Sequence, residues 1–127
     1  MIEFLSSPGG NTMGVRLDGK VTADNFRQLD VRLRHLIDLW GQVGLVVVMG
    51  GDARFGIGAR LGGMAMRFRR VGHVERLALL GPPQWEHRVH RRLPLRKASV
   101  RYFPADQLDD AWQWVGATVK RGAARPR

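Results

Sequence analysis

The stretch Leu45-Val46-Val47-Val48-Met49 is a continuous run of apolar, mostly β-branched residues. Such a run is typical of a central strand that is buried on both faces of a sheet. Two more strands are predicted downstream, over residues 76–80 and 99–103, and the alternation of residue types in the second indicates a position nearer an edge. Upstream, residues 2–6 and 12–18 are predicted as two strands of a hairpin, because a turn-rich segment joins them.

A helix is predicted between the hairpin and the central strand, over residues 23–40, where apolar residues recur at helical spacing. Thr22 is the predicted N-cap of this helix. Val21 and Phe26 are placed on either side of it as a hydrophobic staple. Gly41 is expected to end the helix.

Three more helical stretches are predicted over residues 57–71, 83–93 and 107–119. Asp106 is the predicted N-cap of the last of them. The alternation of helices with buried strands predicts an α/β fold: a small mixed, mostly parallel sheet of four or five strands flanked by helices on both faces. Residues 1–119 are predicted to form a single domain, and residues 120–127 a basic flexible tail.

The composition excludes several classes of protein. The 127 residues are 44% hydrophobic and 25% charged, which is typical of one globular domain and not of a disordered chain. No apolar run approaches the roughly 20 residues that a membrane span needs, and no secretory pattern is present at the first residues. The absence of cysteine excludes disulfides and thiolate metal sites. The sequence therefore predicts a cytoplasmic protein.

The net charge of +10 is concentrated in the middle of the chain. Residues 54–101 contain twelve Arg or Lys residues against two acidic ones, whereas the segments on either side are close to neutral. A one-sided basic surface favours an anionic lipid, a nucleic acid or an acidic partner. Specific nucleic-acid binding is not predicted, because no helix-turn-helix, RNA-recognition or zinc-finger pattern is present.

Neither catalytic nor metal chemistry is predicted. Asp109 and Asp110 are adjacent, so on a helix they point about 100° apart and cannot act on one substrate. Glu86, His87 and His90 could be considered as metal ligands, but the surrounding arginines repel a cation. The glycine-rich stretch after the central strand lacks the spacing of a nucleotide-binding loop. The sequence therefore predicts no catalytic residue, no metal and no cofactor.

Five short signatures follow one another along residues 1–119: Gly19-Lys20-Val21-Thr22, Trp40-Gly41, Glu75-Arg76-Leu77-Ala78-Leu79-Leu80-Gly81 leading to Trp85, Tyr102-Phe103-Pro104, and Ala111-Trp112-Gln113-Trp114. In this order they resemble the SpoIIAA-like family, relatives of the STAS domain of anti-sigma-factor antagonists. The resemblance implies a small α/β domain without enzymatic activity that binds a ligand or associates with a membrane. The antagonists carry a phosphorylatable Ser or Thr in the turn that Gly50–Gly56 occupies here without a hydroxyl. A phosphorylation switch is therefore not expected.

The predicted helix over residues 57–71 is the candidate functional element. Its apolar residues fall within one arc, which is expected either to pack on the core or to contact an amphipathic ligand. Three glycines inside it each lower helical stability by about 1 kcal/mol relative to alanine, so movement is expected. The predicted contact residues for a ligand or membrane are Phe55, Ile57, Arg60, Leu61, Met64, Arg67 and Phe68.

Two functions are compatible with the sequence. The first is a non-enzymatic module that binds an amphipathic small molecule or an anionic lipid surface through this mobile helix, which would place the cytoplasmic protein peripherally at a membrane. The alternative is a STAS-type regulatory module that binds another protein and lacks the phosphorylatable serine. Its predicted partner surface consists of Trp85, Arg88, Arg91 and Trp114. A homodimer is compatible with either function.

Overall fold

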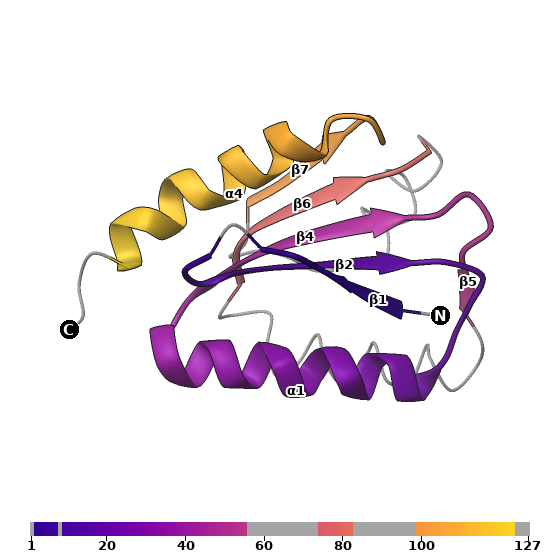
Figure 1. Ribbon diagram of the computed structural model, residues 1–127, viewed down its shortest axis with the longest axis horizontal. Coiled ribbons are helices and arrows are strands. Elements are labelled where there is room, and N and C mark those ends of the chain that lie inside the picture. Colours follow the sequence, from indigo (N-terminus) through magenta and orange to yellow (C-terminus); the bar gives the residue numbers. More distant parts are fainter. Residues whose placement is uncertain (1, 8, 56–73, 83–98, 124–127) are drawn as a thin grey trace.

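The computed structural model describes residues 2–7, 9–55, 74–82 and 99–123 (Figure 1). The elements are β1 (Ile2–Leu5), β2 (Thr12–Leu17), β3 (Lys20–Val21), α1 (Ala23–Trp40), β4 (Val43–Met49), β5 (Arg54–Phe55), β6 (Val74–Leu80), β7 (Ser99–Phe103) and α4 (Leu108–Ala123). The helices predicted over 57–71 and 83–93 lie outside the described residues. Among the helices that the structure describes, none has both the length and the hydropathy that crossing a bilayer requires.

Five strands form one sheet in the order β1-β2-β4-β6-β7. The two N-terminal strands are antiparallel, with Ile2 opposite Leu17, and the other neighbouring pairs are parallel. β4 lies in the centre, as the apolar run predicts, and β7 has β6 as its neighbour and no second one among the described strands. The predicted small, mostly parallel α/β sheet is therefore confirmed.

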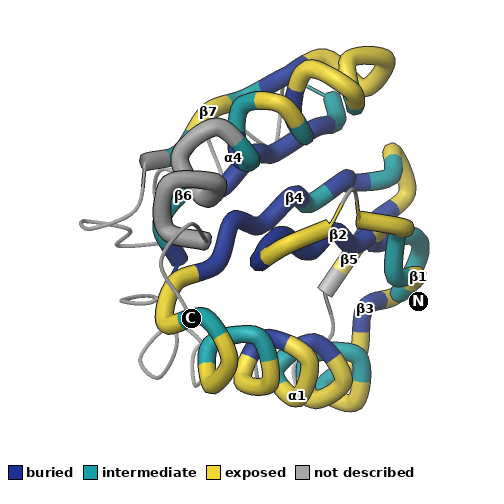
Figure 2. The backbone as a smooth tube through the Cα atoms, turned by 60° about the vertical axis from the view of Figure 1, so that its left-hand side comes forward, coloured by how far each residue is buried: buried dark blue, intermediate teal, exposed yellow. Residues whose placement is uncertain are grey.

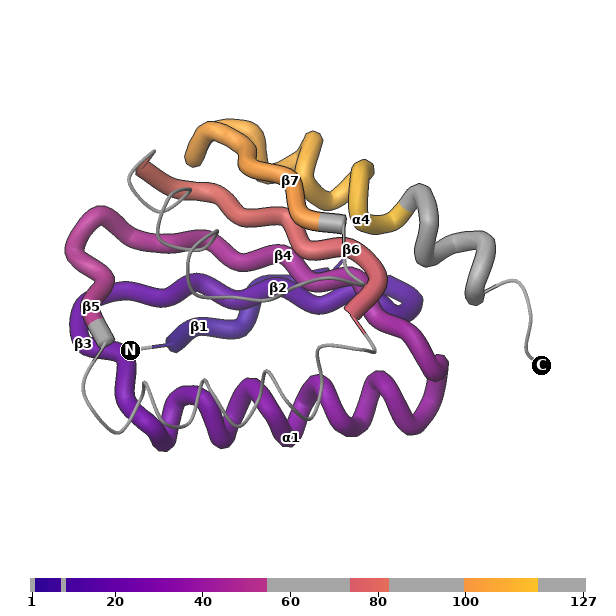
Figure 3. Tube along the Cα trace, turned by 180° about the vertical axis from the view of Figure 1, so that it is seen from behind, coloured from indigo at the N-terminus to yellow at the C-terminus, as the bar shows by residue number. Residues whose placement is uncertain are grey.

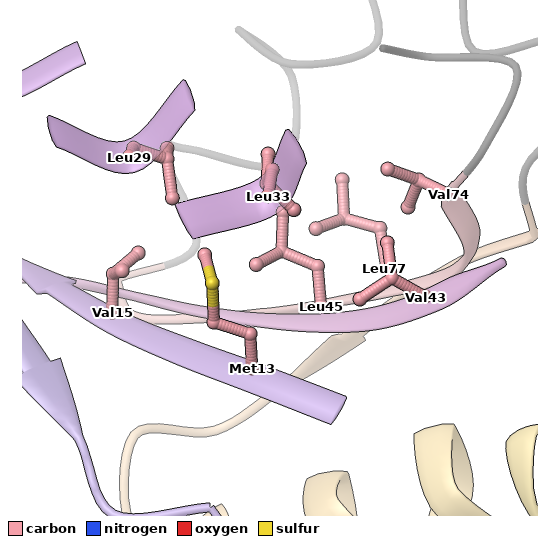
Figure 4. Packing of buried hydrophobic residues seen from close by; sticks show 8 residues of the cluster. All are labelled: Met13, Val15, Leu29, Leu33, Val43, Leu45, Val74 and Leu77. Atoms are coloured by element: carbon pink, nitrogen blue, oxygen red, sulfur yellow. The ribbon is translucent and has the colours of Figure 1, made fainter. Parts of the chain in front are cut away.

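The sheet lies between two helices, with α1 against one face and α4 against the other (Figures 1 and 2). Because side chains alternate along a strand, β4 contributes Leu45 to the α1 side and Val46 to the α4 side. Figure 4 shows the core on the α1 side, where Leu29 and Leu33 of α1 point toward the sheet. The core on the α4 side contains Val46, Val48, Ala78, Leu80, Phe103, Ala111 and Val115.

The bounds of α1 agree with the prediction, because both ends carry specific capping contacts. The Asn25 N–H donates to the Thr22 hydroxyl at 3.2 Å, and the Thr22 N–H donates to the Asn25 side-chain oxygen at 2.9 Å, which completes a capping box. Val21 and Phe26 belong to one hydrophobic cluster, as a staple requires. Gly41 has φ +82° and ends the helix by donating its N–H to the Ile37 carbonyl.

Thr22→Ala is expected to lower the free energy of unfolding by about 1 kcal/mol, because it leaves the Asn25 N–H without its acceptor. For a domain of this size, the midpoint of thermal unfolding should fall by about 3–6 °C. Thr22→Ser is the control, since it keeps the hydroxyl, and its stability should stay within about 0.5 kcal/mol of the wild type. Equal losses in the two variants would contradict the role of the cap.

The last helix differs from its prediction at both ends. α4 begins at Leu108, and its first hydrogen bond runs from the Ala111 N–H to the Gln107 carbonyl at 3.2 Å. Gln107 is thus the residue at the N-cap position, and the assignment of Asp106 as the cap was wrong by one residue. The helix continues to Ala123, beyond the predicted end at 119. The rest of the predicted tail, 124–127, lies outside the described residues.

Candidate functional site

The structure describes two of the predicted site residues. Phe55 ends β5, and Trp114 lies on α4. The other predicted contact residues, Ile57, Arg60, Leu61, Met64, Arg67 and Phe68, lie outside the described residues. The same holds for Trp85, Arg88 and Arg91 of the alternative partner surface. The structure therefore describes two places: the residues just before the predicted contact segment, and the surroundings of Trp114.

The backbone of Phe55 is held by a two-stranded parallel sheet that the sequence did not predict. β3 pairs with β5 so that Val21 lies opposite Phe55, and the Arg54 N–H donates to the Gly19 carbonyl at 2.8 Å. Because Thr22, the N-cap of α1, follows Val21 directly, the pairing of Val21 with Phe55 places the backbone of β5 near the amino end of α1. Figure 3 shows β3 and β5 at this end of the helix. The predicted contact segment therefore starts from a defined position.

Two carboxylates lie close to Gly50, in the turns that precede β3 and β5. Asp18 follows β2 and Asp52 follows β4, and Oδ1 of Asp52 accepts the Gly19 N–H at 3.2 Å. A Cβ at position 50 would overlap Oδ1 of Asp18 and lie 3.2 Å from Oδ1 of Asp52, so Gly50 is needed for this close approach. Within the described ranges, no three His, Cys, Asp or Glu side chains gather as metal ligands.

Trp114 belongs to a group of adjoining cationic and aromatic side chains on the α4 side of the sheet, here named the Arg76–Arg101 cluster: Arg76, Arg101, Phe103 and Trp114. The Arg76 guanidinium carbon lies 4.8 Å from the centre of the Trp114 ring, and its Nη1 donates to the Trp114 carbonyl at 2.7 Å. The Phe103 and Trp114 ring centres are 6.1 Å apart. The Arg101 guanidinium carbon lies 5.0 Å from the centre of the Phe103 ring.

Sequence reasoning singled out Trp114 but missed its three neighbours. The available signal was the spacing of Arg101 and Phe103, two residues apart on one strand, which places both on the same face. Trp114 and Arg76 are half-buried, and Arg101 is exposed. The cluster is thus accessible from solvent at Arg101 and packed against the core at Phe103, which is buried.

Most of the charge that predicts a basic surface belongs to residues that the structure does not describe. The described residues contain equal numbers of basic and acidic side chains. The net charge of +10 on the whole chain is therefore carried by residues outside the described ranges. Segment 56–73, which includes every predicted contact residue except Phe55, contributes four arginines and no acidic residue to this excess.

Comparison with known proteins identifies a family and a solved structure that share this fold. The profile of the family described as SpoIIAA-like matches residues 12–116. The crystal structure of an uncharacterized protein from the DUF3478 family with a SpoIIAA-like fold, from Shewanella loihica PV-4, is similar to the chain with a TM-score of 0.63. The two sequences are 18% identical, and the similarity covers 91% of this chain and 92% of that chain. No curated protein sequence matches the chain.

Proposed function

The chain belongs to the SpoIIAA-like family, and from this premise we propose that it binds an amphipathic, lipid-like ligand or an anionic membrane surface through residues 57–71. The SpoIIAA-like fold indicates a non-enzymatic regulatory module. The proposal adds a ligand class and a contact segment to that general role. It places the protein peripherally at a membrane when the ligand is a lipid surface.

The observation that carries the proposal is the anchoring of Phe55 beside the amino end of α1. The next described strand, β6, begins at Val74, which pairs with Val43 at the opposite end of the sheet. We therefore expect the intervening chain to run the length of the sheet. A helix over residues 57–71 would be about 22 Å long, and a strand as long as β4 spans about 23 Å. The predicted helix thus has the length that this connection needs.

The strand order favours the α1 side of the sheet for this connection. β2, β4 and β6 are parallel neighbours in chain order, and α1 connects the first two of them. Connections between parallel strands are right-handed in nearly all proteins, so successive connections in one direction cross the same face. We therefore expect residues 57–71 to lie beside α1. In that position their apolar arc can either pack on the sheet or contact a ligand.

Electrostatic attraction between the arginines and an anionic membrane is too weak to explain binding at physiological salt. A basic residue near an anionic membrane contributes about 1 kcal/mol, so Arg60 and Arg67 alone give weak attraction. Salt weakens this attraction further, since the screening length is about 8 Å at physiological ionic strength. Binding that persists at such salt therefore requires insertion of apolar side chains. Replacement of Leu61 and Phe68, two large apolar residues of the segment, tests whether such insertion occurs.

The test is cosedimentation of the full chain with neutral phosphatidylcholine vesicles and with vesicles that also contain phosphatidylglycerol, at low and at near-physiological salt. The wild type is expected to sediment with the anionic vesicles at both salt concentrations. The variant Leu61→Asp/Phe68→Asp is expected to stay in the supernatant at both. Circular dichroism and thermal unfolding establish that this variant is folded.

The matched control places the same two changes on α1. Val31 and Leu39 are apolar residues with 56% and 65% of their surface exposed. Val31→Asp/Leu39→Asp adds the same negative charge, so it should retain vesicle binding if residues 57–71 make the contact. Retention of binding by a folded Leu61→Asp/Phe68→Asp variant would refute the proposal. Loss of wild-type binding at the higher salt would also refute it, and would favour an acidic protein partner for the basic segments.

A further inference from the structure

The Arg76–Arg101 cluster brings two guanidinium groups to one region of the sheet face that α4 covers. Arg76 lies opposite Ser99 in the pairing of β6 with β7, and Ala78 lies opposite Arg101. Arg76 and Arg101 are therefore diagonal neighbours on the same face, and the spacing and rise of parallel strands put their Cα atoms about 8 Å apart. Two arginine side chains at this separation are long enough to donate to a single ligand group.

The aromatic rings hold both guanidiniums in defined positions. Stacking on Trp114 and on Phe103 favours the cations electrostatically and limits their rotation. Arg76 donates one N–H, on Nη1, to the Trp114 carbonyl, and a guanidinium has five N–H donors, so this bond leaves four others. Fixed donors lose less entropy when a ligand binds.

Neither guanidinium is neutralised by a neighbouring carboxylate in the described part of the chain. Arg76 and Arg101 contact aromatic rings, whereas the close ion pair of α1 joins Asp24 to Arg27 at 2.7 Å. The half-buried position of Arg76 lowers the local dielectric, which strengthens its attraction for an anion. The exposed Arg101 leaves the cluster open to solvent.

We propose that the Arg76–Arg101 cluster binds a phosphate monoester group. Guanidinium groups match phosphate oxygens with paired hydrogen bonds, and a phosphate monoester offers three oxygens and a charge approaching −2 to two cations at once. A carboxylate offers two oxygens and a single charge, so it should bind more weakly. The site lies on the α4 side, away from the proposed lipid contact beside α1, and does not depend on it.

The test follows the indole N–H signals of the ¹⁵N-labelled full chain during titration with inorganic phosphate at constant ionic strength. The Trp114 signal is identified by its loss in Trp114→Phe. We expect it to shift saturably with a Kd on the order of 1 mM. Acetate at the same ionic strength is expected to shift it less. Glycerol 3-phosphate and phosphatidic acid vesicles, tested with the Leu61→Asp/Phe68→Asp variant, distinguish a soluble phosphate ester from a lipid headgroup.

Arg101→Gln should raise the Kd for phosphate by about tenfold or more, because it removes a charged donor. Since Arg101 is exposed, this variant should unfold at the wild-type temperature. Arg16→Gln, which removes an exposed arginine of β2, is the control and should leave the Kd unchanged. The absence of a saturable shift in the wild type would overturn the proposal. Equal affinity in Arg101→Gln and the wild type would overturn it as well.

Discussion

Gly14→Ala is expected to lower the free energy of unfolding by about 1–3 kcal/mol, although alanine is ordinarily tolerated better than glycine in a strand. Gly14 lies in β2 under the indole of Trp112 from α4. A Cβ at this position would lie 2.6 Å from Cη2 and 2.8 Å from Cζ2 of that ring. The ring is rigid, so α4 must shift to make room. The midpoint of thermal unfolding should fall by about 3–6 °C for each kcal/mol.

Two comparisons make this prediction specific to the contact between Gly14 and Trp112. Gly116 lies in the middle of α4, and a Cβ there meets no atom within 4 Å, so Gly116→Ala should stabilise the protein by up to about 1 kcal/mol. Phenylalanine lacks Cη2 and Cζ2 of the indole, so Gly14→Ala should cost much less in a Trp112→Phe background. An equal cost in both backgrounds would contradict the close contact.

The parts of the fold that the sequence predicted correctly are those with strong local signals. The bounds of α1 follow from the polar cap at Thr22 and from Gly41, a residue type that readily adopts the positive φ found there. The central position of β4 follows from an apolar run that has no polar side chain to present to water. Both signals arise from residues that are close together in the sequence, so they can be recognised without the structure.

The small sheet of β3 and β5 could not be predicted in the same way. Each strand has two residues, which is too short for a periodic pattern, and the pairing joins Val21 to Phe55 across a long stretch of chain. The Arg76–Arg101 cluster depends on the register of β6 against β7 and on how α4 lies over them. Register sets which side chains share a face, and it is a property of the assembled sheet.

The predicted contact segment shows a different limit of sequence reasoning. One helical arc of apolar residues carried the prediction of Ile57, Leu61, Met64 and Phe68 as contact residues. The same arc is required of a helix that packs on a core and of a helix that inserts into a lipid surface. The pattern therefore identifies the face but not its partner. The function of this segment stays a proposal, which the vesicle experiment tests.

Leu33→Ala is expected to have the largest effect on stability, a loss of about 2–5 kcal/mol, because it leaves a cavity between α1 and the sheet. The Leu33 side chain is 1% exposed and belongs to the cluster that includes Val15 and Leu45 of the two strands below it (Figure 4). Urea denaturation followed by circular dichroism measures this change. A loss below about 1 kcal/mol would show that α1 does not depend on this contact.

Val31→Ala is the control for Leu33→Ala, because it changes the same helix at a position that does not pack on the core. Val31 is on the same helix, two residues before Leu33, and 56% of its surface is exposed. Its replacement removes little buried apolar surface and puts a better helix former in place of a β-branched residue, so stability should change by no more than about 0.5 kcal/mol. If Leu33→Ala lowers the free energy of unfolding much more than Val31→Ala does, then α1 is stabilised by the packing of its apolar stripe on the sheet. Since Val21 leads directly into that helix and pairs with Phe55, the same packing then holds the start of the predicted contact segment in place.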